Sequence, residues 1–383
     1  MSIVVFDFEG TTFNTCNVYD PRTYVCLLVV KVISNNSEST FSFTKPWDVG
    51  RIHEIFNSAK LLVGFNCKFD LSWLRREFNY VPPFGTRIYD AQYAEFIFSR
   101  QTWKFPDLRT ACIKREVRQK LDFIKENYWD QGIDTDQIPP DELLEYCIGD
   151  VESTYELYLK QMELFRSKYN HLYSLFRLHM LDLPVLLEME WNGLKYNKQK
   201  SLDLANEYDQ RITEIEIKLN NAVDFEINWN SNNEKSAILY GGTVSRDLKV
   251  PIGHFKTGTR AGQVKYKTVE SITEFPRLVE PLKIREDGKQ VDNTSVSETV
   301  LRSLRPNKFA KHIIELILER AKLEKMNGTY LKGLPKKIED YQWGEYLHPS
   351  YNQCVAVTGR IASSNPNGQN IPGVGKQLCE SRF

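Results

Sequence analysis

Acidic side chains interrupt or follow apolar runs in three separate segments of the chain, and this combination constrains the fold more than any other feature. Residues 3–9, with the sequence IVVFDFE, are predicted to form a buried strand. Alternate residues of a strand point to the same face, so Asp7 and Glu9 are expected to lie side by side. Asp70 follows the segment VGFNCKF, and Asp150 ends the segment YCIGD. Carboxylates beside such runs are costly to bury unless a cation neutralises them.

A pair of divalent cations is the neutralising charge that these residue types favour. Oxygen-rich acidic sites suit Mg²⁺ or Mn²⁺, and two such ions serve the cleavage of a phosphodiester. We therefore predict that Asp7, Glu9, Asp70 and Asp150 bind two metal ions in a hydrolytic site.

Two polar residues are expected one helical turn from these carboxylates, because positions i and i+4 share a helix face. Tyr146 precedes Asp150 by four residues, and its hydroxyl group can orient the attacking water without binding metal. Asn66 precedes Asp70 by the same interval. Two roles stay open for Asn66: a hydrogen bond at the metal site, or a helix cap.

Composition is that of a globular protein with more than one domain. A chain of 383 residues is long enough for two or three domains, and 12% aromatic with 26% charged residues is ordinary for a soluble protein. No apolar run reaches the roughly 18 residues of a membrane span. Strand-like sequence begins by Ile3, which leaves no room for a signal peptide. The expected location is the cytoplasm, without a membrane partner.

Cysteine usage and charge distribution refine this picture. Seven cysteines, an odd number with no CxxC pair, favour reduced thiols and argue against structural zinc. The net charge of zero hides an asymmetry: residues 1–165 contain 18 basic and 24 acidic residues, and the remainder contains 32 and 26. An acidic half followed by a basic half fits a protein that handles nucleic acid, although random scatter also produces differences of this size.

Strand and helix patterns alternate in the first half of the chain and predict an α/β domain. Strands are expected at residues 3–8, 24–32, 41–44 and 61–65. Helices are expected at residues 52–59, 70–78, 90–98 and 107–112, followed by a helix capped by Asp141 that runs towards residue 165.

The second half is mainly helical, with one stretch of different character. Residues 168–222 read as helix interrupted at Pro184, and residues 296–334 read as helix again. Between them, residues 225–295 read as short strands or an insert without helical periodicity. Residues 243–268 contain six basic residues and one acid. A loop that contacts phosphates and a solvated lysine-rich loop are both open interpretations of that segment.

The three acidic segments, taken in order, resemble the three motifs of DEDD-type 3′–5′ exonucleases, in the variant with tyrosine in the third motif. The resemblance implies a ribonuclease H-like fold and removal of nucleotides from DNA 3′ ends. It implies catalytic and metal-binding roles for Asp7, Glu9, Asp70 and Asp150, and a catalytic role for Tyr146. For Asn66 it implies contact with DNA. Phe13 is interpreted as a core residue rather than as a wedge at the 3′ end.

Later segments resemble family A DNA polymerases. Residues 186–194, LLEMEWNGL, are similar to the segment that joins exonuclease to polymerase, and residues 322–330, KLEKMNGTY, to the tip of the thumb. Residues 358–372, TGRIASSNPNGQNIP, closely resemble a signature that holds primer–template duplex. That resemblance implies DNA-binding roles for Arg360, Asn367, Gln369 and Asn370, whose donors suit backbone and groove edges. Gly368 replaces a leucine of the signature and is expected to loosen the local backbone.

These resemblances define the expected organisation. We expect an exonuclease domain over residues 1–165 and a mainly helical connecting and thumb-like region over residues 166–340, with the insert at about 225–295. The start of a polymerase palm is expected over residues 341–383. The aspartate motifs of a palm do not occur before Phe383, so this polypeptide is not expected to polymerise by itself.

The leading functional prediction is the metal-dependent proofreading exonuclease part of a family A DNA polymerase, of the phage type and therefore placed in a host cytoplasm. DNA is the expected partner, both as a single-stranded 3′ end and as primer–template duplex. The alternative is a DNA-binding subunit of a split polymerase, completed by a second chain that contains palm and fingers.

Overall fold

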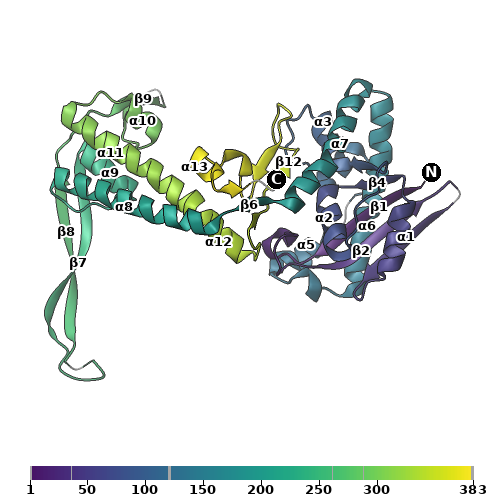
Figure 1. Cartoon of the computed structure of the whole chain (residues 1–383), viewed down its shortest axis with the longest axis horizontal. Coiled ribbons are helices and arrows are strands. Elements are labelled where there is room, and N and C mark those ends of the chain that lie inside the picture. The colour runs from purple at the N-terminus through teal and green to yellow at the C-terminus, as the bar shows by residue number, and fades with distance from the viewer. Residues whose placement is uncertain (1, 36, 120–121, 261, 288, 381–383) are drawn as a thin grey trace. The chain divides into compact units, whose positions relative to one another are not determined.

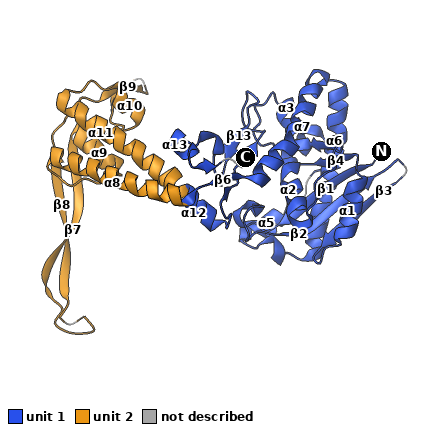
Figure 2. Ribbon diagram, viewed as in Figure 1, with its two compact units in different colours: residues 1–198, 334–383 blue, residues 199–333 orange. Residues whose placement is uncertain are grey.

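The computed structural model describes residues 2–35, 37–119, 122–260, 262–287 and 289–380. The chain divides into two compact units, residues 1–198 with 334–383 and residues 199–333 (Figure 2). The motif-based boundaries at residues 165 and 340 stay a prediction, and Phe383 lies outside the described residues. Among the described helices, none is long and apolar enough to cross a membrane.

A five-stranded mixed sheet forms the centre of the first unit (Figure 1). Its strands are β1 (Ile3–Gly10), β2 (Val25–Ile33), β3 (Glu38–Thr44), β4 (Leu61–Gly64) and β5 (Arg87–Asp90). The strand order is β3-β2-β1-β4-β5. β1 is antiparallel to β2 and parallel to β4, and β4 is parallel to β5. This order, with helices packed on the sheet, confirms the expected ribonuclease H-like α/β fold.

Helices account for most of the remaining chain in this part of the unit. They are α1 (Val49–Ser58), α2 (Cys67–Phe78), α3 (Ala91–Phe98), α4 (Leu108–Arg115), α5 (Phe123–Asn127), α6 (Pro140–Arg166) and α7 (Asn170–Asn192). Single 3₁₀ turns occur at η1 (Phe13–Cys16), η2 (Trp129–Gln131) and η3 (Thr135–Gln137).

Four expectations for this part of the chain were wrong in their details. Asp141 lies in the first turn of α6 instead of capping it, because the helix begins at Pro140, whose fixed φ suits that position. Pro184 lies inside α7 and does not end it. Phe13 is 47% exposed and is therefore not a core residue; the Arg22 guanidinium lies 4.7 Å from its ring centroid. Strand β5 was not predicted, since only four residues form it.

The C-terminal part of the same unit consists of short elements. They are β6 (Leu194–Tyr196), α12 (Gly333–Asp340), β11 (Tyr346–Leu347), β12 (Ser350–Asn352), β13 (Ala362–Ser364), η5 (Gly368–Asn370), α13 (Gly373–Lys376) and β14 (Cys379–Glu380). Lys68 of α2 forms an ion pair with Glu190 of α7 and donates to the Tyr351 carbonyl oxygen at 2.5 Å. The Glu190 carboxylate also accepts from the Tyr351 N–H, so this buried group connects α2, α7 and β12.

The second unit combines helices with two hairpins. Its elements are α8 (Lys198–Val223), α9 (Asn232–Tyr240), β7 (Gly242–His254), β8 (Val264–Phe275), β9 (Leu282–Glu286), β10 (Lys289–Asn293), α10 (Glu298–Ser303), α11 (Lys308–Lys325) and the π-helix η4 (Met326–Lys332). Helix α9 corrects the prediction of a stretch without helix. The S-x-x-E sequence at its start was an available signal, because the Ser231 hydroxyl accepts from the Glu234 N–H.

A buried ion pair joins α3 to α4 in the first unit. The Arg115 Nε and Nη2 donate to the two Glu95 carboxylate oxygens at 2.7 and 2.8 Å. The Gln161 side chain of α6 donates to the same carboxylate at 3.0 Å. The Glu95 side chain is fully buried and that of Arg115 is 12% exposed, so water cannot replace the guanidinium.

We predict that Arg115→Met lowers the free energy of unfolding by about 3 kcal/mol, because it leaves a buried carboxylate without its counter-charge. Arg51→Met is the matched control, since the Arg51–Glu54 pair is exposed and is expected to contribute less than about 1 kcal/mol. Urea unfolding followed by circular dichroism measures both. Equal losses in the two variants would contradict a structural role for the buried pair.

Candidate active site

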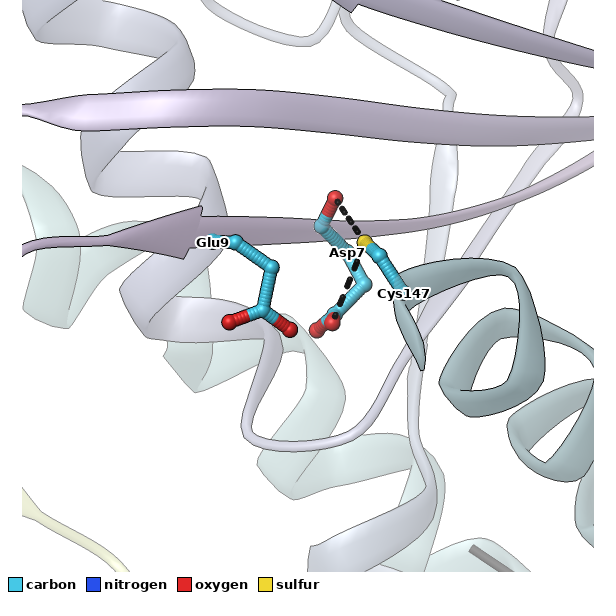
Figure 3. Close-up of side chains that lie close together, drawn as sticks. All are labelled: Asp7, Glu9 and Cys147. Carbon is cyan, nitrogen blue, oxygen red and sulfur yellow. Dashed lines mark hydrogen bonds between the residues drawn. The ribbon is translucent and has the colours of Figure 1, made fainter. Parts of the chain in front are cut away.

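Strand β1 presents two of the predicted carboxylates on one face. Asp7 and Glu9 point to the same side of the strand, towards Cys147 of α6 (Figure 3). One ligand atom from each of the three residues lies within 4.8 Å of the others. The Cys147 thiol is 3.8 Å from both the Asp7 carbonyl oxygen and the Asp7 Oδ2, and it donates to them. The β1–β2 register, which places Asp7 opposite Val29, fixes this orientation.

Asp70 reaches the same strand from the first turn of α2. Its Oδ1 accepts from the Phe8 N–H at 3.1 Å, and its side chain is almost fully buried. The Asp70 carboxylate lies near the N-terminus of α2, where the helix dipole favours negative charge.

Asn66 does not share a helix face with Asp70, which corrects the i, i+4 expectation. Helix α2 begins at Cys67, and Asn66 adopts a left-handed conformation (φ 62°) at the N-cap without a side-chain capping bond. Its backbone N–H donates to the Asp90 Oδ1 at 3.0 Å, and its side chain is exposed.

Asp90 is a structural residue that the sequence analysis missed as part of this region. Its carboxylate accepts from the N–H groups of Asn66 and Cys67 at the start of α2 and from that of Gln92 at the start of α3. It therefore fixes the N-terminal ends of two helices. The predicted helix begins at residue 90 itself, one residue before α3 begins, and nothing in the sequence indicates the contact with the second helix.

Asp150 and Tyr146 lie one turn apart on α6, and both side chains are buried. The Tyr146 ring packs edge-on against Trp129 and Phe123, with centroid distances of 5.8 and 6.2 Å. Cys147 follows Tyr146 directly and precedes Asp150 by one helical turn. This position indicates that its thiol lies near the carboxylates, although the sequence analysis did not predict it.

The described geometry brings Asp7 and Glu9 together with the Cys147 thiol, whereas Asp70 and Asp150 are not in that 4.8 Å group although their charges act on the same thiol. Burial raises the pKa of Cys147 well above its usual value, and the charges of Asp7, Glu9, Asp150 and Asp70 raise it further. Burial, followed by the charge of Asp7, likewise raises the pKa of Asp70. Such a group of desolvated acids is most stable with a cation among them. The oxygen donors fit Mg²⁺ or Mn²⁺, whereas a thiol that retains its proton is no ligand for either ion.

The segment at residues 358–372 exposes the polar residues predicted to contact DNA. Arg360, Asn367, Gln369 and Asn370 are all exposed to solvent. The Arg360 Nε donates to the Thr358 Oγ1 at 3.3 Å, and the Asn367 side chain accepts from the Asn370 N–H at 3.1 Å.

The structure gives a steric reason for a glycine at position 368. A Cβ atom on Gly368 would lie 3.0 Å from the Pro349 Cγ. The Gly368 N–H donates to the Ser363 hydroxyl at 3.0 Å. The glycine therefore allows a close approach to Pro349, and the expected loosening of the backbone stays a prediction.

Two family models match the chain. The model described as 3′-5′ exonuclease matches residues 3–164, and the model described as DNA polymerase family A matches residues 259–382. DNA polymerase I of Deinococcus radiodurans is 38% identical over 85 residues, which cover 22% of this chain and 9% of that protein. DNA polymerase I of Borreliella burgdorferi is 23% identical over 344 residues, which cover 86% of this chain and 30% of that protein.

A solved structure shows the same fold. The structure described as the POL domain of Pol1 from M. smegmatis in complex with DNA primer-template and dNTP has a TM-score of 0.62 and 15% sequence identity. The similarity covers 98% of this chain and 54% of that one. The chain thus spans about half of the solved neighbour and 9–30% of the curated relatives named here.

The mixed sheet and its helices define a domain of the ribonuclease H-like class. The matched family models then describe the chain more closely: residues 3–164 are similar to a 3′–5′ exonuclease domain and residues 259–382 to a family A DNA polymerase domain. None of these relatives supports the alternative of a separate subunit completed by a second chain. The phage-type assignment stays a prediction.

The raised pKa of Asp70 predicts how stability depends on pH in the metal-free protein. The folded state holds the Asp70 proton more tightly than the unfolded state, so stability is full below about pH 4 and falls as the pH rises towards the folded pKa. Asp70→Asn removes this loss. In EDTA at neutral pH we expect the variant to unfold at a higher temperature than the wild type, and calorimetry measures the difference.

Adding Mg²⁺ separates this explanation from a general gain in packing. The ion is expected to raise the unfolding temperature of the wild type and to have little effect on Asp70→Asn. A variant that is less stable than the wild type at every pH in EDTA would contradict the electrostatic explanation.

Proposed function

We propose that this chain removes nucleotides from the 3′ ends of DNA by metal-dependent hydrolysis, as the proofreading part of a family A DNA polymerase. One observation supports the proposal most directly: Asp7 and Glu9 of β1 lie together beside α6, and Asp70 of α2 accepts from the Phe8 N–H of the same strand, in a domain that matches a 3′–5′ exonuclease model. Four clustered acids have no structural advantage, because like charges in a desolvated site repel one another.

Asp7, Glu9, Asp70 and Asp150 are the proposed ligands of two Mg²⁺ or Mn²⁺ ions. When bound, such ions supply an activated water and stabilise the charge that develops on the phosphate. The protein holds the carboxylates in place beforehand: the Phe8 N–H binds the Asp70 carboxylate, and the Cys147 thiol binds that of Asp7. Fixed ligands avoid the cost of ordering them when substrate binds.

Tyr146 is the proposed residue that orients the attacking water. Its ring packs edge-on against Trp129 and Phe123, so the position of its hydroxyl oxygen is fixed by the packing. The exposed Asn66 at the start of α2 is a proposed contact for a single-stranded 3′ end. Arg360, Asn367, Gln369 and Asn370 are proposed contacts for primer–template duplex. Their donors suit phosphate oxygens and groove edges.

We predict that Asp7→Ala combined with Glu9→Ala abolishes Mg²⁺-dependent digestion of single-stranded DNA, because the metal site loses two ligands. A 5′-labelled oligonucleotide resolved on a gel measures the activity. The matched control is Asp141→Ala with Glu145→Ala, which removes two exposed acids from α6 and is expected to retain activity. Digestion by the Asp7/Glu9 variant at the wild-type rate would overturn the assignment.

Tyr146→Phe tests the proposed role in orienting water. The variant retains the ring and its packing, so we expect metal affinity and the unfolding temperature to stay near those of the wild type. The loss of the hydroxyl is expected to lower kcat roughly 10- to 1000-fold. Single-turnover kinetics and Mn²⁺ titration measure the two quantities. A variant that loses metal affinity and not kcat would show that the hydroxyl supports a ligand instead.

A further inference from the structure

The β7–β8 hairpin has an outer part without a hydrophobic core. Among the described residues of the hairpin, those at its base pack against the second unit: Val244 and Phe275 are buried, and Arg246 forms an ion pair with Glu234 at 2.8 Å. From Asp247 onward every residue of β7 is exposed, and β8 is exposed from Val264 to Glu270. Figure 1 shows the two strands extending away from the helices of this unit. A two-stranded ribbon is at most marginally stable in water by itself, so this one is suited to a partner that covers it.

Charge is separated along the hairpin. Residues 248–269 contain Lys249, Lys256, Arg260, Lys265 and Lys267 and no acidic residue. At the base, by contrast, Asp247 lies opposite Glu270. Within the part of the chain that the structure describes, none of the five cations forms an ion pair, so all five are available to a ligand. An uncompensated group of cations on an exposed element attracts a polyanion.

The cations occur on both faces of the ribbon. The register pairs Lys249 with Thr268 and Val250 with Lys267, and neighbouring register positions lie on opposite faces. Lys265 lies two residues from Lys267 and therefore shares its face. A ligand that surrounds the ribbon would meet positive charge on both sides, whereas a flat surface would meet the charges of one face alone.

The dimensions fit duplex DNA. The outer residues of β8, Val264 to Glu270, extend for about 24 Å, which is about two thirds of one helical turn of DNA at ~35 Å. The major groove is about 12 Å wide and admits a two-stranded ribbon between rows of phosphates. The outer part contains two aromatic residues, Phe255 and Tyr266. Proteins that bind single strands stack successive bases on several aromatic side chains, so the composition of the hairpin favours duplex DNA.

We propose that the outer part of the β7–β8 hairpin is a duplex-DNA-binding arm whose five cations contact phosphates on both sides of a groove. The arm adds a binding site to the chain that is separate from the carboxylate site and does not depend on the proposed nuclease activity. Binding is independent of sequence, since lysine and arginine contacts to phosphates carry no base readout.

The test measures how duplex affinity depends on salt for the full chain in EDTA, so that no nuclease reaction interferes. Fluorescence anisotropy with a duplex of about two helical turns is recorded between about 50 and 200 mM salt. The neutral variant carries Lys249→Gln, Lys256→Gln, Arg260→Gln, Lys265→Gln and Lys267→Gln. Each lost phosphate contact reduces the slope of log Kobs against log salt by about 0.9, so the five together reduce it by up to about 4.5.

A charge-conserving variant is the matched control. Lys249→Arg, Lys256→Arg, Lys265→Arg and Lys267→Arg, with Arg260 retained, are expected to preserve the wild-type slope. A single-stranded oligonucleotide of equal length is expected to show a smaller change in slope than the duplex. Because the substituted residues are exposed, both variants are expected to unfold at the wild-type temperature and to retain digestion of single-stranded DNA in Mg²⁺.

Three results would overturn the proposal. The first is a neutral variant whose slope on duplex equals that of the wild type. The second is aggregation of the neutral variant with an unchanged slope for the remaining monomer, which would show that the lysines only protect free strand edges. The third is loss of binding to anionic lipid vesicles with unchanged duplex affinity, which would assign the arm to a membrane surface. Loss of nuclease activity in Asp7→Ala with Glu9→Ala leaves each of these results unaffected, so the two proposals fail separately.

Discussion

Repulsion among buried carboxylates is the constraint on which the first unit depends. Asp7, Glu9, Asp70 and Asp150 come from three elements; Asp7 and Glu9 lie beside the Cys147 thiol, and Asp70 accepts from the Phe8 N–H of the same strand. Such a group of carboxylates lowers stability in the absence of a cation, so the surrounding structure must hold it by other interactions. Apart from the partly buried Ile3, the apolar residues of β1 are almost completely buried, and the parallel and antiparallel neighbours of the strand fix its register. A slip of one residue would turn both β1 carboxylates to the opposite face.

The Asp90 carboxylate supports the site without being one of its four proposed metal ligands. Asp90 accepts backbone N–H groups at the starts of α2 and α3. Through α2 it positions Asp70, whose carboxylate in turn accepts from the Phe8 N–H. Burial raises the pKa of Asp90, and the hydrogen bonds from these N–H groups counteract that effect. The active site is therefore connected to the sheet by hydrogen bonds to backbone amides as well as by packing.

The second unit uses charge in a different way. In the first unit acidic groups are buried and close together, whereas the outer β7–β8 hairpin exposes five cations on an element without a core. Both arrangements are unfavourable for an isolated chain, because one concentrates charge in an apolar interior and the other leaves a ribbon uncovered. In the two proposals, a ligand of the opposite charge makes each arrangement favourable: divalent ions in the first case and DNA phosphates in the second.

The sequence by itself determined the strand that carries Asp7 and Glu9, the helix that carries Tyr146 and Asp150, and the α/β class, because strand and helix periodicity are local properties. It also determined the family resemblance, since three motifs in a fixed order resemble those of 3′–5′ exonucleases and residues 3–164 match that family model. Only the tertiary structure decided that Cys147 lies among the carboxylates, that Asn66 precedes its helix instead of sharing a face with Asp70, and that Pro184 lies within α7. These outcomes depend on contacts between residues distant in sequence: Asp90 fixes the start of α2, and burial of Met180 and Leu183 stabilises α7 around its proline. Local patterns cannot contain that information, because the free energy that decides it arises when separate elements pack together.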